Sequence, residues 1–342
     1  MFPAIERDLS KNQLFQSWKK KSVSEQLLGE PKILQEEFSS EWFRKLKNVI
    51  GDGPLTSRFL ANLAEYIQCI QGLDGYDNIK KRLEKVDEGF YPVVSEIEFI
   101  YFLLLKTSSS CVHLECTFDT ERKKHPELKV DYNSGSAFFE VTSVQDYKEM
   151  GSILQYFNIL TALQLSIKTI YNLRRKIVIE FSKYPTEKMF VAIYKMLNKK
   201  IGKKGTDAFY PILFQEETDD YRLTFSEGNE VIFDLPTNLF EKKIKEKLDE
   251  ETRHFDVGKP NYIVLDVTPI VLKMSSLEEK VREYFRYTQN KTVWGVLLMS
   301  NRWTFKNLEP AYKICIAHQA SPLIDTKRSL DIVSGLLPQK IY

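Results

Sequence analysis

Short apolar segments with the two-residue period of β-strands alternate with helical segments of ten or more residues from residue 93 onward. This alternation predicts an α/β fold whose sheet is covered by helices on both faces. The first three strand candidates follow one another closely, as in a hairpin, so the sheet is expected to be mixed rather than all parallel. The strand candidates are 111–118, 127–132, 136–144, 175–183, 208–215, 221–227, 230–236, 261–270 and 293–301.

Residues 1–90 contain helical patterns and no strand candidate. The segment 39–50 opens with serines suited to an N-cap and carries apolar residues at helical spacing, and 55–73 repeats that spacing. We therefore predict an N-terminal helical region, 1–90, followed by an α/β domain, 91–342. At 342 residues the chain is long enough to bury a large core as one large or two medium domains.

Charge and composition narrow the possible partners. The net charge is only +2, so any surface that attracts nucleic acid must be local. The four cysteines and four histidines do not fall at zinc-site spacings, which argues against a disulfide framework or a thiolate metal site. The N-terminal segment does not resemble a signal peptide, and the longest apolar run, 99–105, is too short to span a bilayer. These features predict a cytoplasmic protein with no membrane partner.

Two acids lie on neighbouring strand candidates in "HPELKVDYNSGSAFFEVTSV", residues 125–144. The tetrapeptide NSGS between them is rich in turn-forming residues. If its central serine and glycine form the loop, Asp131 lies opposite position 138 and Lys129 lies opposite Glu140. Asp131 is then diagonal to Glu140 on the same face, whereas a shift of one residue would send the two acids to opposite faces.

Two carboxylates that converge near a lysine suit a hard divalent cation. Mg²⁺ prefers oxygen ligands and is commonly held by one or two carboxylates, and Mn²⁺ accepts similar ligands. Such an ion can polarise a phosphodiester and lower the pKa of an attacking water. Lys129 could then orient the nucleophile or stabilise the developing charge.

At these residues the chain resembles the PD-(D/E)xK nuclease superfamily, which has the restriction-endonuclease-like fold. The core of that family is a helix, a three-stranded meander, a helix and a further strand, the order expected over 93–182; residues 183–342 would extend this core. The family motif pairs an acid on the second strand, often after proline, with (D/E)-x-K on the third. Here Pro126 and Asp131 lie on the second strand, and Glu140-Val141-Thr142 lies on the third.

The resemblance implies that Asp131 and Glu140 bind Mg²⁺ or Mn²⁺. It also implies that a glutamate of the preceding helix, Glu98 or Glu96, completes the site. We favour Glu98 as the third metal ligand because it lies nearly three turns before the end of that helix.

Thr142 departs from the family motif, because a threonine cannot supply the positive charge of the expected lysine. Some members of the superfamily place the lysine on a neighbouring element, and Lys129 could take that role. Otherwise the domain would be a relative that has lost catalysis.

Each candidate residue also has a plainer interpretation. Asp131 and Glu140 could belong to a solvated hairpin, and Lys129 could simply be a cross-strand partner of Glu140. Acids near a helix N-terminus, such as Glu96 and Glu98, are favoured by the helix dipole. Further polar residues near the hairpin are assigned to ordinary helix faces or sheet edges: Glu115, Asp119, Gln155, Gln164 and Lys168.

Two lysine clusters could contact phosphates without sequence specificity. Five lysines lie within 195–205 and three within 17–22, and the alternative for both is a solvated helix end.

The sequence contains no phosphate-binding glycine-rich loop, no G-x-S-x-G elbow and no H-E-x-x-H motif. The leading hypothesis is a divalent-metal-dependent nuclease that acts on nucleic acid, with DNA as the expected substrate and an oligomer possible. The alternative is a catalytically inactive nuclease-like domain that serves as a nucleic-acid-binding or assembly module.

Overall fold

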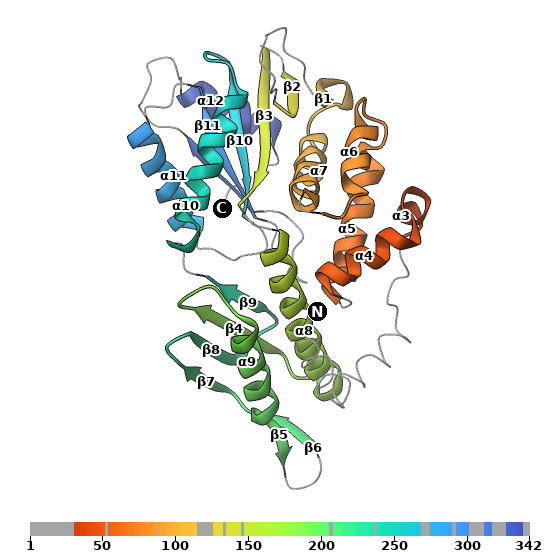
Figure 1. Ribbon diagram of the computed structural model, residues 1–342, viewed down its shortest axis with the longest axis vertical. Coiled ribbons are helices and arrows are strands. Elements are labelled where there is room, and N and C mark those ends of the chain that lie inside the picture. The colour runs from red at the N-terminus through yellow and green to blue at the C-terminus, as the bar shows by residue number, and fades with distance from the viewer. Residues whose placement is uncertain are drawn as a thin grey trace.

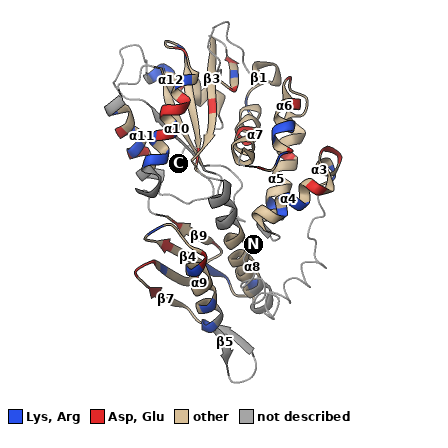
Figure 2. Ribbon diagram, in the orientation of Figure 1, with Lys and Arg blue, Asp and Glu red and all other residues tan. Residues whose placement is uncertain are grey.

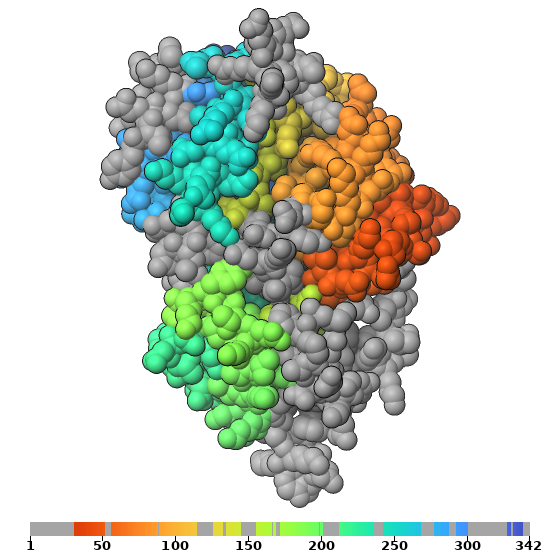
Figure 3. Space-filling view, viewed as in Figure 1, coloured from red at the N-terminus to blue at the C-terminus, as the bar shows by residue number. Residues whose placement is uncertain are grey.

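Two units that each contain a β-sheet make up the fold, and the long helix α8 (Tyr147–Tyr171) connects them (Figure 1). In the space-filling view the two units form an upper and a lower lobe (Figure 3). The computed structural model describes residues 31–51, 54–87, 89–114, 126–132, 135–144, 147–204, 208–235, 238–267, 274–288, 292–300, 311–316 and 326–337.

The larger unit is built on a six-stranded sheet with the order β1-β2-β3-β10-β11-β12. Its three central strands, β3, β10 and β11, are parallel, and the outer pairs are antiparallel. The strands are β1 (Val112–Leu114), β2 (Leu128–Tyr132), β3 (Gly135–Ser143), β10 (Asn261–Asp266), β11 (Gly295–Ser300) and β12 (Ala311–Ile316). All six residues of β10 are buried, as expected for a parallel strand in the middle of a sheet.

The smaller unit has a second mixed sheet with the order β7-β8-β4-β9, in which β4 and β9 are parallel. A two-stranded ladder of β5 and β6 follows α9. The elements are β4 (Arg175–Phe181), α9 (Glu187–Lys200), β5 (Ile201–Lys204), β6 (Ala208–Pro211), β7 (Phe214–Glu217), β8 (Tyr221–Glu227) and β9 (Val231–Asp234). The predicted α/β class with mixed sheets flanked by helices is therefore confirmed.

Helices cover both faces of the six-stranded sheet. Helices from the N-terminal region and α12 pack on one face, where Phe139 and Val141 of β3 join their core. Helices α10 and α11 pack on the other face, where Phe138 lies in a core that continues into the smaller unit. In the described ranges, no helix combines the length and the apolar character that a membrane span requires. The helices of this unit are α3 (Lys32–Glu37), α4 (Ser40–Ile50), α5 (Pro54–Ile70), α6 (Tyr76–Leu83), α7 (Phe90–Leu104), α10 (Asn238–Glu251), α11 (Met274–Thr288) and α12 (Thr326–Leu336), with short 3₁₀ turns at Ser109–Cys111 (η1) and Thr252–His254 (η2).

The N-terminal helices share one hydrophobic core with the sheet. That core runs from Leu34 through the helices to Tyr262 of β10, so the described part of the predicted region 1–90 packs directly on the sheet. Residues 1–30, which include the lysine cluster at 17–22, lie outside the described residues.

Helix α8 also binds the end of α4 through side-chain amides. Gln155 donates to the carbonyl of Val49 at 3.0 Å, and Asn158 donates to the carbonyl of Ile50 at 2.7 Å. These carbonyls belong to the last turn of α4, whose backbone acceptors have no partner within the helix. The helix that leads to the smaller unit is thereby anchored to the N-terminal helices.

The strand expected to complete the nuclease-like core does not join the predicted sheet. Residues 175–181 form β4 in the smaller unit, and β10 lies beside β3 instead, parallel to it, with Glu140 opposite Ile263. The 25-residue helix α8 explains the difference, because at 1.5 Å per residue it carries the chain about 37 Å from the end of β3. The continuous core predicted over 93–182 is thus divided between two sheets.

Candidate functional site

Strand β3 extends beyond the start of β2, so part of its edge has no strand partner among the residues that the structure describes. The ladder between them runs from Tyr132–Gly135 to Leu128–Phe139, so residues 140–143 lie past the first residue of β2. Glu127, the residue just before β2, occupies this edge. Its backbone N–H donates to Glu140 Oε2 at 3.2 Å, and its own carboxylate accepts from the N–H of Val141 at 3.3 Å.

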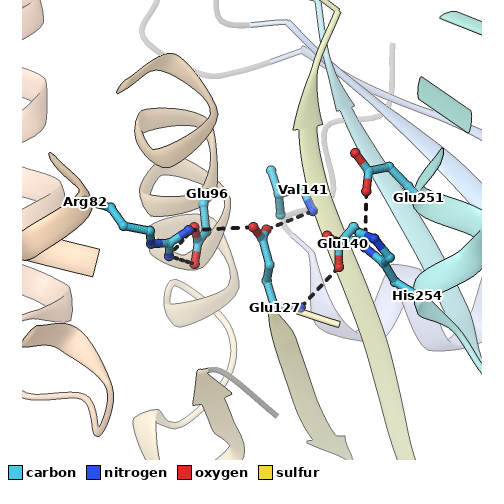
Figure 4. Close-up of polar contacts among 7 residues, drawn as sticks. All are labelled: Arg82, Glu96, Glu127, Glu140, Val141, Glu251 and His254. Carbon is cyan, nitrogen blue, oxygen red and sulfur yellow. Dashed lines mark hydrogen bonds and ion pairs between the residues drawn. The ribbon is translucent and has the colours of Figure 1, made fainter. Parts of the chain in front are cut away.

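From the α7 face of the sheet, an ion pair approaches Glu127 (Figure 4). Arg82 on α6 donates through Nη2 to both carboxylate oxygens of Glu96 on α7, at 2.9 and 2.7 Å. Its Nη1 lies 3.6 Å from Glu127 Oε1. Arg82 therefore stands between the two carboxylates and offsets part of their mutual repulsion.

From the opposite face, α10 and η2 bring two further groups to Glu140. His254 Nδ1 lies 2.8 Å from Glu140 Oε1 and 3.2 Å from Glu251 Oε2 (Figure 4). Thr142, two residues along β3, forms a side-chain hydrogen bond with Glu251. Because alternate residues of a strand share a face, Glu140 and Thr142 both point toward α10.

The result is a row of four carboxylates that passes around the edge of β3 from one helical layer to the other. Two cationic or ionisable basic groups face it. The members of this row, which we call the edge cluster, are Glu96, Glu127, Glu140 and Glu251, together with Arg82 and His254.

Burial and mutual repulsion disfavour the ionised form of these acids. The pKa of Glu140 is raised by burial and by the nearby Glu251 carboxylate, against the lowering effect of the Glu127 N–H. The pKa of Glu127 is raised by burial and by Glu96 and Glu140, although Arg82 opposes the shift. Burial also raises the pKa of Glu251, while Thr142 and His254 act to lower it. Such a cluster of carboxylates would be stabilised by a bound divalent cation, which would displace the protons.

Solvent reaches the edge cluster from the β2 side. The side chains of Glu127 and Arg82 are 28% and 36% exposed, whereas that of Glu140 is 7% exposed. A ligand could therefore contact the cluster at Glu127 and Arg82 without a rearrangement of the core.

The predicted register of the hairpin is wrong by two residues. Asp131 lies opposite Ser136 rather than Phe138, and Lys129 lies opposite Phe138 rather than Glu140. Gly135, expected in the loop, instead begins β3 with a φ of +154°, a backbone conformation that a residue with a side chain disfavours. The glycine therefore belongs to the ladder, and the connection falls on 133–134, outside the described residues.

The corrected register keeps Asp131 and Glu140 on one face but separates them along it. The partner of Asp131 is four residues from Glu140 on β3, about 13 Å at the rise of a strand. Asp131 instead accepts hydrogen bonds from Ser136 at 2.6 Å and Lys129 at 3.2 Å, and lies 2.8 Å from His113 Nε2. Partial desolvation works to raise the pKa of Asp131, but these contacts outweigh it and lower that pKa to about 2. Lys129 is thus the partner of Asp131, not of Glu140.

The two helix glutamates lie on different sides of α7. Glu96 joins the edge cluster through Arg82. Glu98, which we favoured, is buried against α5, where it accepts a hydrogen bond from the hydroxyl of Tyr66 at 3.2 Å. Of the five residues predicted for the site, the structure brings Glu96 and Glu140 together through Glu127 and leaves Asp131, Lys129 and Glu98 outside.

Sequence reasoning missed Glu127, Arg82, Glu251 and His254. A signal for Glu127 was present, because it directly follows Pro126, the position where the motif often places its acid. Glu251 and His254 also have the i, i+3 spacing that places two side chains on one helix face. Of the other polar candidates, Glu115 and Asp119 lie outside the described residues, and Gln155 binds the end of α4. Gln164 donates to the carbonyl of Arg175, and Lys168 is exposed.

Comparison of the chain with protein-family models, with curated proteins and with solved structures finds no match.

Proposed function

We propose that the chain is a divalent-metal-dependent nuclease that hydrolyses phosphodiester bonds in DNA, with the edge cluster as its active site. The observation that carries this proposal is the contact between Glu127 and Glu140 at the edge of β3, within reach of Arg82. Glu127 follows Pro126, and Glu140 begins the Glu-Val-Thr tripeptide, so the pair fits the acid positions of the PD-(D/E)xK motif better than Asp131 and Glu140 do.

The order of elements also supports a restriction-endonuclease-like core. Helix α7 and the meander β1-β2-β3 are followed, after residues 144–237, by helix α10 and by β10, which is parallel to β3. This is the helix, meander, helix and strand order of the superfamily, with α8 and the smaller unit as an insertion. In this proposal the second core helix is α10, the helix that carries Glu251.

The donor set suits a divalent cation. Glu127 offers carboxylate oxygens at the solvent-accessible end of the cluster, and the buried Glu140 lies next to it. Glu96 is hydrogen-bonded to Arg82 on the α7 side. A bound Mg²⁺ or Mn²⁺ would supply Lewis acidity toward the phosphodiester and toward a water nucleophile. Arg82 would place a fixed positive charge where a phosphate could approach, the contribution that Thr142 cannot make.

The smaller unit supports nucleic acid as the partner through an exposed stripe of lysines on α9. Lys188, Lys195 and Lys199 are seven and four residues apart, so they share one helix face, and all three are exposed. None of them has an ion-pair partner among the described residues, whereas Lys176 and Lys183 of the same unit pair with acids. Figure 2 shows the basic positions of α9, and Figure 3 shows α9 and α10 at the surface on the same side of the molecule.

The proposal predicts cleavage of plasmid or single-stranded DNA in the presence of Mn²⁺ or Mg²⁺. EDTA should stop the reaction, and added metal should restore it, because the cluster has no other source of Lewis acidity. The assay is gel electrophoresis of the products over time. Binding of DNA without metal-dependent cleavage would instead support an inactive binding or assembly module, the alternative that Thr142 at the motif lysine position favours.

Neutralising the α9 stripe is predicted to weaken DNA binding and its salt dependence. In the triple variant Lys188→Ala, Lys195→Ala, Lys199→Ala, the slope of log affinity against log salt should fall by about 2 to 3, since each phosphate contact to duplex DNA contributes about 0.9. Fluorescence anisotropy with labelled duplex in EDTA measures this slope without cleavage. The matched control is Lys176→Ala, Lys183→Ala, which removes two ion-paired lysines. An unchanged slope in the triple variant would exclude α9 as a phosphate-binding surface.

A further inference from the structure

The α10 side of the edge cluster has a different donor set from the β2 side. One atom each from Glu140, Glu251 and His254 lies within 4.8 Å of the other two, and these residues come from β3, α10 and η2. Counted as whole residues, backbone included, Glu140 and Glu251 are 5% and 6% exposed. Buried carboxylates are rare unless a cation or a hydrogen-bond network compensates them. The arrangement offers two oxygens and one nitrogen to a single point.

Other groups hold the carboxylates of this set in place. The N–H of Glu127 binds Glu140 Oε2, while Oε1 faces His254. Thr142 holds Glu251 by a side-chain hydrogen bond. Carboxylates that bind metals are commonly oriented by such outer hydrogen bonds. The threonine at the motif lysine position thus has a function of its own, which is to position a carboxylate from a neighbouring helix.

The spacing of the two α10-side residues is also one that metal sites use. Glu251 and His254 form a Glu-x-x-His sequence at the end of α10. Helical Glu-x-x-His pairs supply a carboxylate and an imidazole to iron and manganese ions in helix-bundle proteins. Here Glu140 adds the third donor from the sheet.

We propose that Glu140, Glu251 and His254 bind a first-row transition-metal ion, such as Mn²⁺, in preference to Mg²⁺. The inference rests on the proposed nuclease function and narrows its cofactor. Mg²⁺ strongly prefers oxygen donors alone, whereas iron and manganese ions also accept mixed sets of carboxylate oxygens and an imidazole nitrogen. Glu140, whose two oxygens face opposite sides of the cluster, links this ion to Glu127 and to the accessible edge.

The test is Mn²⁺ binding to the full-length protein without DNA. Calorimetry gives the affinity for Mn²⁺ and for Mg²⁺, and pulsed electron paramagnetic resonance detects an imidazole nitrogen bound to Mn²⁺. We expect wild type to prefer Mn²⁺ and to show the nitrogen signal. His254→Gln should lose that signal and bind Mn²⁺ at least about tenfold more weakly. Glu251→Gln should weaken binding but keep the signal, and His113→Ala, which alters a histidine beside Asp131, should change neither.

The wild-type spectrum decides the question even if a variant fails to fold. Absence of Mn²⁺ binding, or binding without the nitrogen signal, would overturn the inference; so would unchanged Mn²⁺ affinity in folded His254→Gln. Its failure is distinguishable from failure of the nuclease proposal. Cleavage supported by an ion with oxygen ligands alone would overturn only the ligand set proposed here, whereas a nitrogen-ligated ion without DNA cleavage would overturn only the nuclease.

Discussion

Glu140→Gln is expected to lower the rate of the proposed metal-dependent DNA cleavage by about a thousandfold, because a bound ion would contribute several kcal/mol to transition-state stabilisation. Glutamine keeps the size of the side chain but removes the charge that both sides of the edge cluster share. Glu140 contacts the Glu127 N–H through one oxygen and His254 through the other. Initial rates on plasmid DNA at saturating Mn²⁺ would measure the loss.

The controls for this prediction distinguish the edge cluster from the site that was predicted from the sequence. Asp131→Asn and Glu98→Gln change acids that the family motif predicts as metal ligands together with Glu140. In the structure, these two acids instead bind Lys129 and Tyr66. Both variants should cleave DNA at close to the wild-type rate. If Asp131→Asn were as inactive as Glu140→Gln, the edge cluster would not be the catalytic centre.

Arg82→Met is expected to lower the free energy of unfolding of the larger unit by about 3 kcal/mol, because it removes the positive charge that Arg82 places beside the buried carboxylate of Glu96. The side chain of Glu96 is 2% exposed and receives two hydrogen bonds from Arg82. Urea denaturation, combined with hydrogen exchange of α6 and α7 peptides, would report the loss locally.

The double variant Arg82→Met, Glu96→Leu is the informative comparison. Removing both charges replaces the ion pair with apolar contacts, and such exchanges are close to neutral in stability. Recovery in the double variant would show that the buried charge of Glu96, in the absence of Arg82, causes the loss. A similar loss in the single and double variants would mean that the packing of Arg82, not its charge, stabilises α6 against α7.

Local patterns predicted the individual elements of the fold. The helices α4 and α5 and the strands β2, β3, β4, β8 and β10 lie within a few residues of the predicted segments. These segments have clear periods of 3.6 or 2 residues, and the serine expected to cap α4 does so, since Ser39 Oγ accepts from the Trp42 N–H. Strand β12 and helix α12 were not predicted.

The arrangement of the strands could not be predicted in the same way. The parallel partner of β3 is β10, which begins more than a hundred residues later. No local sequence pattern distinguishes β10 from β4 as that partner. Both are apolar strands that follow helices, so their order depends on contacts distant in sequence. The hairpin register failed for a related reason, because either placement of Gly135, in the loop or in the ladder, is compatible with the turn-rich sequence.

Only the part of the candidate site that depends on local sequence patterns could be predicted. Glu140 and Glu96 could be proposed because the strand and helix that carry them were identified correctly. Glu251 and His254 approach Glu140 only through the packing of α10 on the sheet, more than a hundred residues along the chain. Residues of this kind require the tertiary structure.

Helix α8 joins the two units along its side rather than only at its ends. Gln155 and Asn158 bind the last carbonyls of α4, and Tyr156 between them stacks on Phe190 of α9. A change in the position of α9 would therefore be passed to α4 through a single turn of α8.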